Sequence, residues 1–166
     1  MQSSQEQTLQ DRNKYLVARY NHEVWIKGNL DIIDEVCSDD FVSDTPVFGR
    51  HCGRSAVKKM LLEIKETFAG VSLHPFGPVP MVAVHNYVVT RFIGGGLQTR
   101  IGFQDALMQE LPRTSTENTG SLSGTAVYRI KHDKIVEEFG EMGALSSLLR
   151  LSSVGIQRSN KDTTAQ

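Results

Sequence analysis

The sequence predicts an α+β fold in which N-terminal helices lie against one curved sheet, mixed or antiparallel, and enclose a pocket. Three helical patterns come first, and closely spaced strand patterns follow them. The run Gly94–Gly96 lets the backbone bend sharply, so we expect a corner in the sheet there. Because a helix cannot fill the whole curve of a strongly bent sheet, a cavity is expected between the two layers.

Apolar residues at helical spacing predict the helices. The first is expected over 3–28, where Gly28 stops it, and a second, shorter helix over 29–36. A third helix is expected over 55–70. The long first helix is expected to lie across the concave face of the sheet.

Alternating apolar residues and turn signals predict the strands. We expect them at 40–47, 71–73, 81–93 and 97–107, followed by two strands joined by a tight turn within 124–141. The segment Pro112–Ser123 is rich in Thr, Ser, Asn and Gly, which predicts a flexible loop and a mobile lid. A short apolar helix is expected to follow the last strand and to end near Leu151.

Length and charge exclude several classes of protein. At 166 residues the chain forms one ordinary domain, expected at 1–151, with a polar, disordered tail at 152–166. A domain of this size buries roughly two thirds of its unfolded surface, which leaves room for a core and a cavity. The 18 basic and 19 acidic side chains create no global field for nucleic acid or an anionic membrane. A small neutral partner fits this balance better.

Cysteine and histidine usage indicates a reduced protein without a metal. Cys37 and Cys52 are too few for a disulfide scaffold and lack the spacing of metal ligands. The five histidines show no metal-binding spacing. No apolar run reaches the roughly 18 residues needed to cross a bilayer, and the first residues lack the order of an export signal. We therefore expect a cytoplasmic protein outside the membrane.

Asp44 and Glu141 are the leading candidates for acid/base chemistry. Asp44 lies late in an apolar strand, where an inward carboxyl is desolvated and its pKa raised; the alternative is a turn aspartate before Pro46. Glu141 follows Phe139 at strand spacing, so an inward Phe139 places Glu141 inward as well. The opposite parity exposes Glu141, together with Glu137, to solvent.

Other polar candidates belong to the later strands. Asp105 alternates with apolar neighbours and is a third carboxyl, and two carboxyls in one cavity push each other's pKa apart. His74 precedes a proline at a strand end and is a candidate for the mouth of the cavity. Arg91 either stabilises a substrate anion or forms a salt bridge on the outer face. The apolar wall is expected to include Trp25, Tyr20, Phe103, Tyr128 and Phe139.

The order of several short motifs resembles the nuclear transport factor 2-like superfamily and, within it, the SnoaL-like polyketide cyclases and isomerases. These motifs are Trp25 with 27–31, Asp40-Phe41-Val42, Gly49, Gly53, Arg91, Thr119-Gly120, Tyr128-Arg129-Ile130 and 134–138. The resemblance implies a cone-shaped fold with one pocket. It also implies cofactor-independent ring closure, rearrangement or isomerisation of a hydrophobic, polycyclic or polyketide-like substrate, and a dimer.

The sequence departs from this family pattern at the acid/base positions. Gly143 stands where many such cyclases have an aspartate, Ala126 where related isomerases and epoxide hydrolases have one, and Asp44 where a histidine is common. The leading hypothesis is a cyclase or isomerase of secondary metabolism that uses Glu141 and Asp44. The alternative is a non-catalytic ligand-binding or dimerisation module. If Glu141, Asp44 and Asp105 all face solvent, the binding alternative is favoured. Convergence of two or more of them within about 7 Å, in a pocket of at least about 300 Å³, favours catalysis. Alternating apolar residues on the outer sheet face predict a homodimer.

Overall fold

The protein folds as helices packed against one strongly curled, mixed sheet, in a computed structural model that describes residues 2–46, 48–98 and 119–143. The helices are α1 (Gln2–Asn21), the π-helical turn η1 (His22–Lys27), α2 (Ile32–Val36) and α3 (Arg54–Thr67). The strands are β1 (Cys37–Thr45), β2 (Gly49–Cys52), β3 (Phe68–Pro75), β4 (Met81–Val84), β5 (Tyr87–Gln98), β6 (Thr119–Lys131) and β7 (Lys134–Met142). The predicted α+β class is confirmed.

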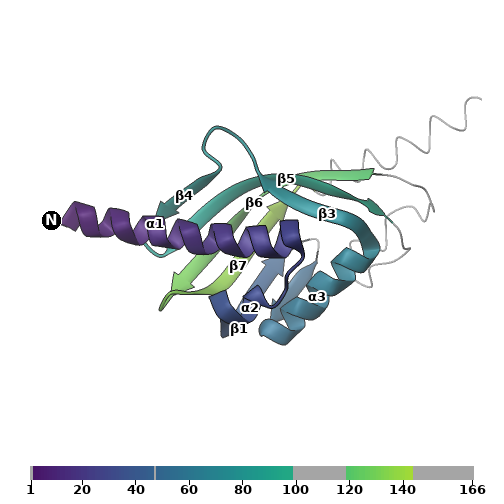
Figure 1. Cartoon of the computed structure of the whole chain (residues 1–166), viewed down its shortest axis with the longest axis horizontal. Helices are drawn as coiled ribbons and strands as arrows, with labels where there is room; N and C mark the ends of the chain where they lie inside the picture. The colour runs from purple at the N-terminus through teal and green to yellow at the C-terminus, as the bar shows by residue number, and fades with distance from the viewer. Residues whose placement is uncertain (1, 47, 99–118, 144–166) are drawn as a thin grey trace, which may run out of the picture.

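The sheet has the order β2-β1-β7-β6-β5-β3 within the described ranges, and β4 pairs with β5 beside β3. β1 and β7 run parallel, and the other neighbours are antiparallel. Figure 1 shows α1 lying across the sheet, with its N-terminal end extending beyond it and α3 packed at the other end. This arrangement leaves the C-terminal turns of α1 and η1 opposite the middle of the sheet.

The predicted first helix is α1 continued by η1. Val17, Tyr20, Val24 and Trp25 form its buried stripe. Gly28 ends it, as predicted, in the left-handed conformation at φ 78°, and its N–H donates to the carbonyl of Glu23. No helix in the described part of the chain is both long and apolar enough to cross a bilayer.

The predicted strand over 81–93 is wrong as a single element. It is a hairpin in which Val84 pairs with Tyr87 and the chain turns at His85 and Asn86, with His85 at φ 50°. The apolar alternation on both sides of the turn concealed it, although asparagine is a common turn residue. β5 then continues through Gly94–Gly96 to Gln98, where the sequence predicted a corner. The predicted loop and lid at 112–123 is wrong for residues 119–123, which form the start of β6. The rest of the lid, the rest of the predicted strand to 107, the last helix and the tail lie outside the described residues.

Gly94 allows β3 and β5 to approach each other closely. A Cβ atom at Gly94 would lie 2.1 Å from the carbonyl oxygen of Ser72 and 2.5 Å from the Leu73 side chain. β3 also carries a bulge between Ala69 and Ser72. The glycine therefore serves strand packing, and the bulge adds bending where the sheet curls.

Candidate active site

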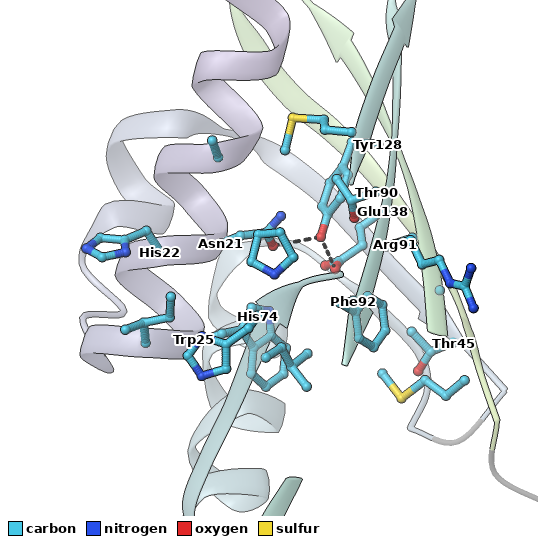
Figure 2. Close-up of a pocket in the computed structure, with 18 residues that line it drawn as sticks. Asn21, His22, Trp25, Thr45, His74, Thr90, Arg91, Phe92, Tyr128 and Glu138 are labelled. Carbon is cyan, nitrogen blue, oxygen red and sulfur yellow. Dashed lines mark hydrogen bonds between the residues drawn. The ribbon is translucent and has the colours of Figure 1, made fainter. Parts of the chain in front are cut away.

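A pocket of about 320 Å³ lies between α1–η1 and the inner face of the sheet (Figure 2). Its wall is largely apolar, and its described lining residues include Trp25, Leu73, Met81, Phe92 and Ala126. A volume of this size is typical of a small-molecule site. The cavity expected from a helix crossing a bent sheet is therefore present.

The carboxyl group of Glu138, from β7, lies in the wall of this pocket. The Tyr128 hydroxyl lies 3.0 Å from its Oε1, and the hydroxyls of Tyr20 and Ser43 lie 3.1 Å and 3.4 Å from its Oε2. Tyr128 also reaches the side-chain Oδ1 of Asn21 at 2.9 Å, as the dashed lines of Figure 2 show. Residues from α1, β1, β6 and β7 thus meet at one carboxyl group.

Burial decides the electrostatics of this cluster. Glu138 is only 8 % exposed, and its burial raises the pKa of the carboxyl; the Tyr128, Tyr20 and Ser43 hydroxyls lower that pKa in part. No described lysine, arginine or histidine forms an ion pair with it. Burial, followed by the charge that Glu138 carries when it is ionised, raises the pKa of Tyr20 and Tyr128, so both phenols stay protonated at neutral pH.

The aromatic rings of the cluster hold the hydroxyl groups in position. The Tyr20 ring meets the Tyr128 and Phe41 rings edge to face, with centroids 5.9 Å and 6.1 Å apart. Such packing restricts both tyrosines to one orientation each. The carboxyl therefore sits in a preformed polar centre within an apolar wall.

A β-bulge in β7 turns Glu138 inward. Arg129 pairs with Glu137, whereas the next residue of β6, Ile130, pairs with Ile135, so Val136 is an extra residue. One extra residue reverses the face of every residue that follows it. The prediction that Phe139 and Glu141 point into the pocket is therefore wrong. Glu141 is exposed and Phe139 is 41 % exposed on the outer face. The structure has the opposite parity, in which Glu137 and Glu141 lie on the outer face.

Asp44 also lies on the outer face, contrary to the prediction of an inward carboxyl. Phe41, Ser43 and Thr45 are the buried residues of this part of β1. The Asp44 side chain turns away from them, and its Oδ2 lies 3.2 Å from Nη1 of Arg50 on β2. Ser43 takes the inward place, so the polar contribution of β1 to the pocket is a hydroxyl group.

Of the other residues predicted for the site, some lie in or near the pocket and some lie outside the described part of the chain. Trp25 and Tyr128 line the pocket, and Tyr20 contacts Glu138 behind it. His74 lies at the pocket's edge, is exposed, and has Nε2 3.2 Å from Oγ of Ser72. Asp105 and Phe103 lie outside the described residues.

Arg91 borders the pocket but directs its side chain away from it (Figure 2). Its neighbours Thr90 and Phe92 are buried, and strand alternation places Arg91 on the opposite face. The guanidinium carbon lies 5.3 Å from the centroid of the Phe76 ring. Arg91 is thus on the outer face, where it stacks on an aromatic ring.

Sequence reasoning missed Glu138, Asn21 and Ser43. The signal for Asn21 was its place on the apolar stripe of the first helix, between Tyr20 and Val24, where a polar residue needs a partner. Ser43 follows Phe41 at strand spacing and shares its face. Among the described side chains, no three of His, Cys, Asp or Glu come together as a metal site would require.

Solved structures with the same fold cover most of this chain. A candidate SnoaL-like polyketide cyclase from Jannaschia sp. CCS1 aligns at TM-score 0.69 and 14 % identity over 87 % of this chain and 94 % of its own. IdmH, a candidate polyketide cyclase from Streptomyces antibioticus, aligns at 0.66 and 15 % over 84 % and 98 %. An NTF2-like protein from Burkholderia xenovorans LB400 aligns at 0.63 and 16 % over 86 % and 96 %. These similarities show a nuclear transport factor 2-like fold.

Sequence comparison defines the family. No curated protein matches the chain significantly. The family model of the SnoaL-like domain matches residues 17–138, which include α1 from Val17 onward and extend to Glu138 in the pocket. The chain therefore belongs to the SnoaL-like domain family.

Proposed function

We propose that this protein is a cofactor-independent cyclase or isomerase of polyketide- or terpenoid-type secondary metabolites, with Glu138 as its acid/base group. The single observation that carries the proposal is a buried carboxyl in the wall of an apolar pocket, contacted by hydroxyl groups and by no described cation. Burial raises the pKa of this carboxyl toward the range in which one group can both give and take a proton. Membership of the SnoaL-like family supports the same class of reaction.

The described lining of the pocket holds one carboxyl group, not the two or more that were predicted to converge there. One carboxyl group is nevertheless sufficient for a complete proton transfer cycle. The neutral acid of Glu138 donates its proton to a carbonyl oxygen of the substrate, and the resulting carboxylate accepts hydrogen bonds from Tyr20, Tyr128 and Ser43. This carboxylate then removes a proton from the carbon beside the carbonyl, which gives the enol and restores the acid. The proton has moved from carbon to oxygen, so the step needs no oxidant or reductant. In a ring closure, the enol carbon attacks a second carbonyl of the same molecule, and the new C–C bond replaces the π bond of that carbonyl. The new alkoxide oxygen takes the proton of Glu138, and the Glu138 carboxylate takes the proton of the enol hydroxyl, so the acid is restored.

The pocket favours a hydrophobic substrate of moderate size. Trp25, Leu73, Phe92 and Met142 contribute apolar surface around Glu138. Burial of a planar or polycyclic molecule against such a wall is favourable by about 25 cal/mol for each Å² of apolar surface removed from water. Binding energy thus comes from the hydrocarbon body, and the carboxyl acts at one polar point of the substrate.

Proton exchange on a simple ketone tests this function. With α-tetralone in D₂O, we expect the protein to accelerate deuterium incorporation at the carbon beside the carbonyl, measured by NMR. Glu138→Gln should reduce the catalysed rate by about a hundredfold to ten-thousandfold. Glu141→Gln is the matched control, because it makes the same change on the outer face of the same strand; it should keep the rate, as should Asp44→Asn. A Glu138→Gln protein with the wild-type rate would contradict the proposal.

The outer face of the sheet supports a second, compatible role in dimerisation. Val82, Val89, Val127 and Phe139 pair in one row across β4, β5, β6 and β7. Val82, Val89 and Phe139 are exposed, although apolar. An apolar patch that crosses a sheet is typical of a protein interface. We propose a homodimer joined through this face; if no proton exchange is observed, ligand binding or dimerisation becomes the leading function.

A further inference from the structure

The Tyr128 hydroxyl has two neighbours that can accept its proton. Its oxygen lies 2.9 Å from Oδ1 of Asn21 and 3.0 Å from Oε1 of Glu138. A phenol carries only one proton and can donate it to one of them. If the proton goes to Asn21, the contact with Glu138 requires a proton from Glu138 itself.

A count of the protons in the whole cluster also indicates that Glu138 is protonated. Tyr128, Tyr20 and Ser43 make four oxygen–oxygen contacts with Glu138 and Asn21, and their hydroxyls supply three protons. An ionised Glu138 supplies none, so one contact would join two lone pairs. A protonated Glu138 supplies the fourth proton and completes the network: Glu138 donates to Tyr128, and Tyr128 donates to Asn21.

The surroundings of Glu138 contain no charge that would favour its anion. Tyr20 and Asn21 face the cluster from α1, Cys37 and Ser43 from β1, and Tyr128 from β6. Burial raises the pKa of the Cys37 thiol, which therefore stays neutral as well. Within the part of the chain that the structure describes, nothing positive offsets a negative Glu138. Burial and the hydrogen-bond pattern then decide together whether Glu138 is neutral or ionised.

We infer that Asn21 is a positioning residue that keeps Glu138 in its neutral, proton-donating form by accepting the proton of Tyr128. Asn21 acts through the Tyr128 hydroxyl, which lies between Asn21 and Glu138. The inference rests on the proposed function of the same pocket and deepens it, because it assigns the order of the proton transfers. The resident group is an acid, so the first step protonates the substrate. The substrate class is then a ketone or enone, activated at its carbonyl oxygen.

The experiment measures the pKa of Glu138 directly. In protein labelled with ¹³C at the glutamate carboxyl carbons, the Glu138 signal is assigned by its loss in Glu138→Gln and followed across a pH titration. Asn21→Leu is close to isosteric and removes the acceptor, so the Tyr128 proton turns to Glu138 and stabilises the anion. We expect the pKa of Glu138 to fall by about one unit, the effect of one added hydrogen bond to the charged form.

A double variant shows whether the effect passes through the Tyr128 hydroxyl. In a Tyr128→Phe background the link between the two residues is absent, so Asn21→Leu should leave the pKa of Glu138 unchanged. A loss of packing at position 21 would shift the pKa in both backgrounds, which would overturn the inference. If Asn21→Leu does not fold, as judged by circular dichroism, Asn21→Ala makes the same test.

Two further outcomes separate this inference from the proposed function. An unshifted Glu138 pKa in the wild-type protein, or no fall in the single variant, overturns the positioning role whatever the exchange activity. A pKa that falls only when Tyr128 is present supports it, even if α-tetralone is not a substrate. In that last case the proposed reaction fails, and the coupling between Asn21 and Glu138 remains.

Discussion

Ile135 and Glu138 are three residues apart on β7, yet both are buried on the inner side of the sheet. Regular alternation would place them on opposite faces. The extra residue Val136, opposite the step from Arg129 to Ile130, brings them to the same face. This irregularity places a carboxyl in the pocket and leaves Glu141 in solvent.

The buried carboxyl predicts a pH-dependent cost in stability. Folding raises the pKa of Glu138 above the ordinary glutamate value of about 4.3, so the unfolded chain ionises first as the pH rises. The contribution of Glu138 to the free energy of unfolding is fully present below its pKa in the unfolded chain. It is lost as the pH rises toward the pKa of Glu138 in the folded protein. The loss is about 1.4 kcal/mol for each unit of difference between the two values. Glu138→Gln should therefore gain free energy of unfolding relative to wild type as the pH increases.

Urea denaturation at pH 4 and pH 8 checks this prediction, because other titrating groups cancel in the difference between wild type and variant. Glu141→Gln removes an exposed carboxyl from the same strand and should show little change in that difference. A Glu138→Gln difference that is the same at both pH values would mean that the carboxyl titrates alike in the folded and unfolded chains.

Tyr20→Phe should destabilise the protein by about 1 to 2 kcal/mol, because it removes a hydroxyl donor from a buried carboxyl oxygen. The same change should raise the pKa of Glu138 further, since the anion loses more stabilisation than the acid does. The matched control is Tyr15→Phe on the same helix, where the ring is 72 % exposed. Chemical denaturation should show an effect near zero for Tyr15→Phe, and equal effects at both positions would contradict the role given to Tyr20.

Gly94→Ala should be among the more damaging changes in the sheet, costing about 2 kcal/mol or more, because the new methyl group would meet backbone atoms of β3. Gly70→Ala is a useful comparison, since its Cβ would meet nothing within 4 Å and the residue bears only the strain of φ 66°. Thermal unfolding of the two variants should rank Gly94→Ala as clearly less stable. The reverse order would show that β3 moves aside at little cost.

Val89→Glu should dissociate the proposed homodimer, because it places a charge in the centre of the apolar outer row, at a position now 39 % exposed. Sedimentation equilibrium should then give the single-chain mass of 18.5 kDa in place of twice that value. Leu62→Glu, at a site on α3 that is 51 % exposed, is the control and should leave the mass unchanged. A wild-type protein that sediments as a monomer would remove the dimer proposal.

The sequence by itself was enough for the fold class, for the approximate places of the first three predicted helices and for the existence of a pocket. These features depend on local signals: the apolar stripe that ends at Gly28, the stripe of the third helix, and the change from helical to strand spacing after it. Each signal is carried by neighbours along the chain. The family motifs added the expectation of a single cavity, and Trp25 and Tyr128, which were predicted for its wall, line the pocket.

Only the tertiary structure decided which side chains meet in that cavity. The face of Glu138 depends on how β7 pairs with β6, and a bulge of one residue leaves no clear mark in an apolar and acidic run such as 135–138. The hairpin at His85 and the outward turn of Asp44 toward Arg50 likewise depend on strand partners far along the chain or across a turn. Helical and strand patterns depend on residues that are close together in the sequence. The register of a sheet depends on contacts between strands that are distant in the sequence. The residues that bring polar groups into the pocket could therefore be identified only from the tertiary structure.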